Sequence, residues 1–181
     1  MTIKKRPTYA GIGARRTPNL WAPVMRGIAA YLEAQGWILH SGGALGADSF
    51  FESGVKDTTR NARIFLPWQG FNGNPSPWVR IDPKARAIAA EFHPAFGGLS
   101  QGVQKLMSRN SYQVLGPLLD TPVDAVVCWT ANGETSGGTG QALRIAQAHG
   151  VPAFNLHDPT ALDRLAAFVG RATRFHGPDN A

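Results

Sequence analysis

Three short glycine-rich segments carry the residue types best suited to binding chemistry. They are Gly11-Ile-Gly-Ala-Arg-Arg16, Ser41-Gly-Gly-Ala-Leu-Gly-Ala-Asp48 and Ser136-Gly-Gly-Thr-Gly140. Glycine lets backbone N–H groups approach an anion closely, and a helix that begins at such a turn adds free donors and a positive dipole end. Any one of these segments is equally consistent with a plain tight turn. The three together favour a site for a phosphate-bearing ligand.

Polar side chains in and near these turns suit the same ligand. Arg15 can hold a phosphate through two parallel hydrogen bonds. Asp48 can accept hydrogen bonds from ribose hydroxyls or orient Arg109. Alternatively, it lies there only because the helix dipole stabilises a carboxylate in the first helical turn. Arg109 and Asn110 stand among apolar residues of a predicted helix, where an arginine needs a counter-charge or an anion. The predicted ligand-binding residues are Gly13, Arg15, Ser41, Gly42, Gly43, Ala44, Asp48, Arg109, Asn110, Ser136, Gly137, Gly138, Thr139 and Gly140.

Other side chains allow two interpretations each. Glu52, one helical turn after Asp48, either forms a carboxylate pair with it or lies at the surface. Trp68, Phe71 and Trp78 belong to one long loop and either stack a base or seal the edge of a sheet.

These residues are positioned by strands that alternate with helices. Short apolar runs predict strands at 8–13, 37–40, 62–66, 123–129 and 152–156. Apolar residues at helical spacing predict helices at about 18–35, 47–56, 83–92, 101–115, 139–148 and 160–169. Such an alternation predicts a three-layer α/β/α sandwich with a mostly parallel sheet of about five or more strands. The most apolar run, 123–129, is expected at its centre, and ligands bind at the carboxyl ends of such strands, where the glycine turns fall.

Length and charge set further limits. The 181 residues predict a single domain over 1–181, with a core at 8–169 and a frayed tail at 171–181. Hydrophobic residues make up 43%, enough for a packed core. Lys and Arg number 18 against 12 Asp and Glu, and the net charge of +6 favours an anionic partner.

The sequence gives no support to several classes of protein. A single cysteine, Cys128, excludes an internal disulfide framework and suits a reducing compartment. The histidines lack metal-ligand spacing, so we expect no metal and no cofactor; His40 either lies near the site or is a hydrogen-bonded strand-end residue. No apolar run approaches the roughly 20 residues that cross a bilayer, so we expect a cytoplasmic protein without a membrane partner. Arg16 replaces the third glycine of G-x-G-x-x-G and no segment is a P-loop, which argues against ordinary dinucleotide or P-loop ATP chemistry.

The order of these motifs resembles that of DprA/Smf proteins. Similar segments are Thr8-Tyr-Ala-Gly-Ile-Gly-Ala-Arg15, Ser41–Asp48 with Gly54, Ser108-Arg-Asn110, and Ser136-Gly-Gly-Thr-Gly-Gln-Ala142 leading to Gly150-Val-Pro-Ala-Phe154. The resemblance covers about residues 8–156 and extends to the SLOG superfamily, which includes the Lonely Guy (LOG) enzymes. It implies a Rossmann-like fold with a nucleotide or nucleic-acid phosphate site at the glycine turns, and a homodimer.

The LOG resemblance is incomplete at its catalytic motif. LOG enzymes cleave the N-glycosidic bond of nucleoside 5′-monophosphates and carry PGG-x-GT-x-EE. Aligning their glycines with Gly137 and Gly138 places Leu143 and Arg144 where they have two glutamates. The remaining catalytic candidates are Glu134, Asp48 and Arg109.

Three functional hypotheses follow. The first is a binding protein for a nucleotide or nucleotide-derived phosphate ligand. The second is a DprA-like module that binds single-stranded DNA for DNA processing or recombination, which the basic charge favours. The third is a LOG-like nucleotide N-glycosidase that uses a displaced carboxylate. The sequence leans away from an enzyme and leaves the ligand's identity open.

Overall fold

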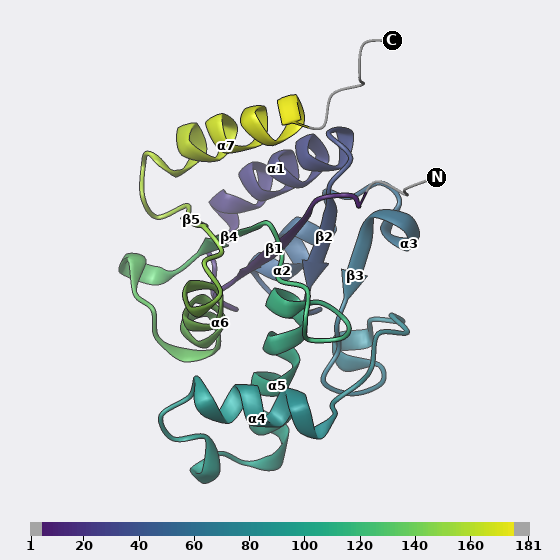
Figure 1. The fold of residues 1–181 in the computed structure, drawn as a ribbon, viewed down its shortest axis with the longest axis vertical. Coiled ribbons are helices and arrows are strands. Elements are labelled where there is room, and N and C mark those ends of the chain that lie inside the picture. The colour runs from purple at the N-terminus through teal and green to yellow at the C-terminus, as the bar shows by residue number, and fades with distance from the viewer. Residues whose placement is uncertain (1–4, 176–181) are drawn as a thin grey trace.

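The centre of the protein is a sheet of five parallel strands in the order β3-β2-β1-β4-β5 (Figure 1). A computed structural model describes residues 5–175. Its strands are β1 (Thr8–Gly13), β2 (Ile38–Ser41), β3 (Ala62–Ile64), β4 (Ala125–Trp129) and β5 (Ala153–Asn155). The parallel sheet with helices on both sides confirms the predicted α/β/α architecture.

Helices cover both faces of the sheet. The longer ones are α1 (Ala22–Ala34), α4 (Pro83–Glu91), α5 (Gln101–Leu115), α6 (Gly137–Ala148) and α7 (Ala161–Phe175), and the short ones are α2 (Ala47–Glu52) and α3 (Thr58–Asn61). In Figure 1, α1 and α7 lie above the sheet, whereas α4, α5 and α6 lie below it. Short 3-10 turns occupy Asn19–Trp21, Phe71–Gly73, Phe96–Gly98 and Ala131–Gly133.

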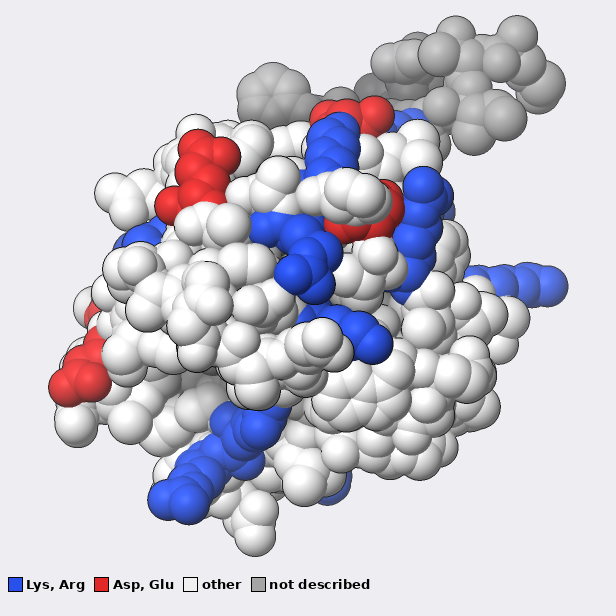
Figure 2. Space-filling view, turned by 90° about the horizontal axis from the view of Figure 1, so that it is seen from below, with Lys and Arg blue, Asp and Glu red and all other residues white. Residues whose placement is uncertain are grey.

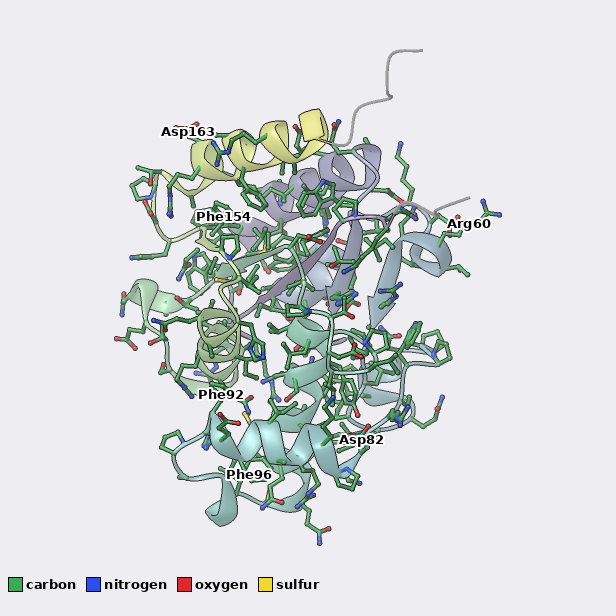
Figure 3. All side chains as sticks on the ribbon, viewed as in Figure 1. Arg60, Asp82, Phe92, Phe96, Phe154 and Asp163 are labelled. Carbon is green, nitrogen blue, oxygen red and sulfur yellow. The ribbon has the colours of Figure 1, made fainter. Side chains whose placement is uncertain are left out.

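Two apolar clusters fill the space between these layers. One packs α1, α2 and α7 against the sheet through residues such as Met25, Phe51 and Leu165. In Figure 3, Phe154 lies between the sheet and α7, where its ring meets Phe168 at 5.5 Å. The second cluster joins α5 and α6 to the opposite face through residues such as Ile145. The apolar spacing in the sequence therefore identified the faces that the helices bury.

The position of β4 departs from the prediction. β4 is fully buried and lies inside the sheet, but β1 holds the middle position. β1 is less apolar than β4 and contains two glycines, at positions where side chains of β2 and α2 approach it closely. A Cβ on Gly11 would lie 2.7 Å from Leu39 Cδ1, and one on Gly13 would lie 2.6 Å from Ala47 Cβ.

Two element ends and one short helix differ from the sequence predictions. α6 begins at Gly137, two residues before the predicted start. The predicted frayed tail at 171–181 is wrong over its first part, because α7 continues to Phe175, and 176–181 lie outside the described residues. The short helix α3 was not predicted. Four residues are too few for a helical repeat to show in the sequence.

Candidate phosphate-binding cleft

A cleft of about 520 Å³ opens at the carboxyl edge of the sheet. Its walls come from the end of β1, the turn after β2, one face of α5 and the first turn of α6. Ten of the predicted ligand residues line it: Gly13, Arg15, Ala44, Asp48, Arg109, Asn110, Ser136, Gly137, Gly138 and Thr139. The fold thus brings together residues from all three glycine turns and from the Arg-Asn helix.

Four predicted ligand residues lie behind the cleft wall. Ser41 ends β2, and Gly42 and Gly43 form the turn after it. Carboxylates of α2 accept their hydrogen bonds, as where Gly42 N donates to Asp48 Oδ2 at 3.1 Å. Gly140 N donates to Ser136 O at 3.0 Å, and a Cβ there would run into the Thr135 carbonyl. In the structure these residues shape the turns.

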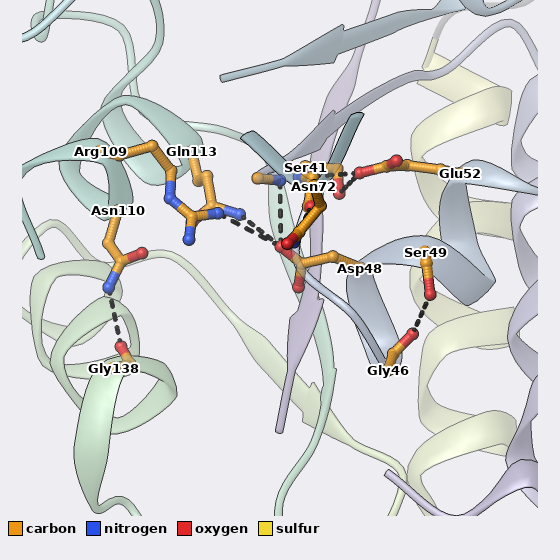
Figure 4. Close-up of polar contacts among 12 residues, drawn as sticks. Ser41, Gly46, Asp48, Ser49, Glu52, Asn72, Arg109, Asn110, Gln113 and Gly138 are labelled. Atoms are coloured by element: carbon orange, nitrogen blue, oxygen red, sulfur yellow. Dashed lines mark hydrogen bonds and ion pairs between the residues drawn. The ribbon is translucent and has the colours of Figure 1, made fainter. Parts of the chain in front are cut away.

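A buried ion pair forms the floor of the cleft. Arg109 Nη1 lies 3.3 Å from Asp48 Oδ2, and the two side chains are 6% and 5% exposed (Figure 4). Gln113 Nε2 adds a long contact of 3.5 Å to the same oxygen. Burial raises the pKa of Asp48, and the Arg109 guanidinium acts against that rise. Asp48 therefore orients Arg109, one of the three roles that the sequence left open.

Gly42 makes room for this guanidinium. A Cβ at position 42 would coincide with Arg109 Nη1, so any larger residue displaces the arginine. The glycine of the second turn is therefore explained by the close approach of a side chain from α5. Sequence reasoning had assigned that close approach to a phosphate.

One donor of Arg109 has no partner. Within the described part of the chain, Arg109 Nε is buried and makes no hydrogen bond. A buried donor left unsatisfied costs roughly 1–3 kcal/mol or more when it is charged. Arg109 is also one of the residues that line the cleft.

The N-terminus of α6 forms the opposite wall. The first backbone N–H groups of a helix have no partner inside it, and here they belong to Gly137, Gly138 and Thr139. The Ser136 side chain does not cap them. Asn110 Nδ2 donates to Gly138 O at 3.1 Å, which ties this turn to α5 (Figure 4). The helix start and its positive dipole end thus lie beside Arg109.

Two arginines stand at the mouth of the cleft. Arg15 and Arg16 both line it and both are exposed. The sequence predicted a ligand role for Arg15 but not for Arg16. It also missed the apolar wall, which one face of α5 provides at i, i+3 and i+4 spacing through Val103, Leu106 and Met107. That spacing was the signal that could have found it.

Glu52 holds the turn after β2 through two hydrogen bonds. Its Oε1 accepts from Ser41 Oγ at 2.6 Å and from Gly43 N at 2.9 Å (Figure 4). Burial, together with the nearby Asp48 charge, raises its pKa to about 7. Glu52 is therefore a half-buried carboxyl beside Asp48, in keeping with the carboxylate-pair interpretation.

Three other residues that the sequence analysis weighed lie outside the cleft lining. Glu134 is exposed on the loop before α6. His40 is buried, its Nδ1 lies 3.2 Å from Gln113 O, and burial lowers its pKa to about 3, so it is a neutral hydrogen-bonded strand residue. Arg144, which stands at a LOG glutamate position, donates to Phe92 O and Thr135 O.

Some site types are absent from the described residues. Over 5–175, no cluster of three or more His, Cys, Asp or Glu side chains is arranged to hold a metal ion. Nor does this part of the chain contain a helix long and apolar enough to cross a bilayer.

The fold and the cleft define a Rossmann-like α/β protein whose polar groups converge at the carboxyl edge of a parallel sheet. Its structure is similar to that of DNA processing protein A from Helicobacter pylori, with a TM-score of 0.50 and 18% sequence identity. The match covers 83% of this chain and 65% of that one, so this chain spans less than two thirds of the length of its structural neighbour. The likeness establishes a DprA-like fold. Comparison with protein-family models and with curated proteins finds no match.

Proposed function

We propose that the cleft binds the phosphate group of a nucleotide or nucleotide-derived ligand. The observation that carries this proposal is the buried Arg109, whose Nε lacks a partner in the described structure and which lies beside the open N-terminus of α6. A guanidinium and a helix N-terminus are both strong phosphate partners. Their convergence favours an anion over a neutral ligand.

The rest of the cleft suits the remainder of a nucleotide. Arg15 and Arg16 add positive charge at the mouth. Val103, Leu106 and Met107 provide an apolar wall on which a sugar or base can pack. The motif resemblance to the SLOG superfamily supports the same ligand class and also implies a homodimer, which light scattering on the purified protein tests.

Thermal stabilisation by nucleoside 5′-monophosphates tests the proposal. A ligand that binds only the folded state raises the melting temperature by mass action. We expect the wild type to shift and the Arg15→Ala/Arg16→Ala double variant to shift much less. Arg60→Ala is the matched control, because Arg60 is 83% exposed and lies on α3, away from the cleft (Figure 3). Equal shifts in all three proteins would refute the assignment of the cleft.

Single-stranded DNA is the second candidate ligand. It is favoured by the DprA-like fold, since the H. pylori structure concerns a single-stranded DNA binding mode, and by the net charge of +6. Figure 2 shows Lys and Arg side chains at several places on one face of the molecule, with Asp and Glu side chains beside some of them. Such a distribution favours several separate phosphate contacts along a strand.

Salt dependence separates the two ligands. A strand held through several phosphates loses affinity steeply as salt is added, because binding releases counterions. A mononucleotide carries a single phosphate group, so its affinity depends on salt much less. Oligonucleotide affinity that does not change with salt, or no oligonucleotide binding at low salt, would remove the second candidate and leave the first.

A further inference from the structure

The loop between β3 and α4 is tied to the turn after β2 and to α2. Asn72 Nδ2 donates to Gly43 O at 2.9 Å, and Asn74 Nδ2 lies 3.4 Å from Glu52 Oε2. A second attachment holds the loop to the sheet, where Ser76 Oγ donates to Ile64 O at 2.6 Å. These contacts place the loop directly beside the turn after β2.

An apolar cluster connects the same loop to the cleft wall. Phe71 is buried in a cluster with Ala44, Leu66 and Leu106. Ala44 and Leu106 also line the cleft. Phe71 thus lies behind the wall, on its loop side.

Trp68 packs on Phe71 and extends the apolar cluster to the protein surface. Its ring meets that of Phe71 edge to face, with 5.1 Å between centroids, and the residue remains 39% exposed. The chain turns sharply after it, with positive φ at Gly70 and Asn72. The indole thus packs against Phe71 while part of its surface faces solvent.

Trp78 offers a comparison within the same loop. It is also 39% exposed, but its ring packs against Phe65 at 5.8 Å and lies under the Arg63 guanidinium at 5.9 Å. Arg63 and Phe65 belong to β3 and the residue after it, at the edge of the sheet. The two tryptophans match in type and exposure but differ in their neighbours.

From this continuity we propose that Trp68 is a base-stacking subsite for single-stranded DNA whose backbone phosphate occupies the cleft. The inference rests on the proposed phosphate site and names its ligand as a strand longer than one nucleotide. A base adjoining the bound phosphate passes over the Leu106 wall and stacks on the exposed indole. Stacking on an aromatic side chain tolerates any base, so the subsite adds affinity without sequence preference. Of the two interpretations of this loop, Trp68 takes the stacking role and Trp78 the edge-sealing role.

Paired binding measurements test this subsite. Fluorescence anisotropy compares a labelled oligothymidylate of about ten nucleotides, within the usual span of single-strand sites, with competition by thymidine 5′-monophosphate. We expect Trp68→Ala to weaken oligonucleotide binding by about fivefold to a hundredfold, the typical effect of losing one stacked base. Its affinity for the mononucleotide should not change. The control Trp78→Ala should bind both ligands as the wild type does, with melting curves confirming that each variant is folded.

Photo-crosslinking gives a measurement that needs no variant. Irradiation of wild-type protein bound to an oligonucleotide that contains 5-iododeoxyuridine should join the base to Trp68. Fragment sequencing of the crosslinked peptide distinguishes Trp68 from Trp78. This readout stands even if Trp68→Ala fails to fold.

The outcomes separate the subsite from the phosphate site. If wild-type protein binds the oligonucleotide but Trp68→Ala binds it equally well, or the crosslink falls elsewhere, the subsite is wrong and the phosphate site stands. Binding of the mononucleotide without any oligonucleotide binding overturns the subsite in the same way. If neither ligand binds, both proposals fail.

Discussion

The buried Asp48–Arg109 pair is the most consequential contact at the scale of single residues. Breaking such a pair leaves an uncompensated charge inside the protein, which typically costs about 3–5 kcal/mol. We therefore expect Asp48→Asn to lower the free energy of unfolding by that amount in urea denaturation. Arg60→Ala removes a partner from an exposed ion pair, where the side chain is 83% exposed, and should cost less than about 1 kcal/mol. Similar losses in the two variants would show that Arg109 does not depend on Asp48.

Glu52 makes stability depend on pH near neutrality. Its pKa is about 7 in the folded protein against an ordinary value near 4.5, so between these values the folded state binds more protons than the unfolded state. The contribution of Glu52 to stability therefore falls as pH rises through this window and is constant above it. We expect Glu52→Gln to reduce the decline in melting temperature between about pH 5 and pH 8.

Calorimetry at a series of pH values measures this effect. The control is Glu91→Gln, which alters an exposed glutamate at the end of α4. A Glu52→Gln curve parallel to that of the wild type would mean that Glu52 titrates alike in the folded and unfolded states.

At the scale of elements, the turn between β2 and α2 is the feature most sensitive to side-chain size. Because a Cβ at Gly42 would coincide with the Arg109 guanidinium, Gly42→Ala displaces that side chain from its place beside Asp48. Overpacking of this kind typically costs about 1–3 kcal/mol. We expect that loss in urea denaturation, together with a smaller nucleotide-induced thermal shift.

A second glycine-to-alanine change controls for the general effect of the substitution. Gly27 lies inside α1, and a Cβ there meets nothing within 4 Å. Gly27→Ala should be neutral or stabilise by up to about 1 kcal/mol, because alanine is the better helix former. Gly43 would be a poor choice for this test. Its φ of +64° strains any side chain, whatever the cleft binds.

The sequence predicted most elements and missed those that tertiary contacts decide. The bounds of β1 and α5 agree with the predictions, because their apolar spacing is clear, a glycine ends β1 and another follows α5. The start of α6 was placed too late because glycine is a poor helix former. Two contacts from α5 help hold that first turn: Asn110 Nδ2 donates to Gly138 O and to Gln141 Oε1. This displacement matters for function, since it puts Gly137 and Gly138 among the free N–H donors.

At the scale of the whole molecule, the sequence predicted the class of fold and many of the cleft residues but not their pairing. Asp48 and Arg109 are 61 residues apart, and nothing local to either shows that they meet. The strand order likewise depends on long-range pairing, which put a glycine-containing strand at the centre of the sheet. Local patterns reveal which residues are buried or turn the chain. They do not reveal which distant residue satisfies a buried charge.

The composition of the assembled cleft argues against glycosidic chemistry. Cleaving the N-glycosidic bond of a nucleotide needs a carboxylate near the sugar carbon that bears the base, to stabilise a developing cation or to activate water. Among the residues described, Asp48 is the one carboxylate that lines the cleft, and it is engaged by Arg109 and Gly42. Glu134 lies outside that lining, and Leu143 and Arg144 offer no carboxylate at the LOG positions.

We therefore expect negligible release of free base from nucleoside 5′-monophosphates, even where they bind. Chromatography after long incubation at several nucleotide concentrations measures it. Glu134→Gln is the informative variant, because Glu134 is exposed and its replacement should leave both the fold and the phosphate contacts intact. Clear turnover by the wild type that disappears in Glu134→Gln, with binding retained, would show that the loop before α6 brings this carboxylate to the bound sugar. Turnover that persists in Glu134→Gln would instead point to Asp48, whose ion pair with Arg109 would then have to open when the nucleotide binds.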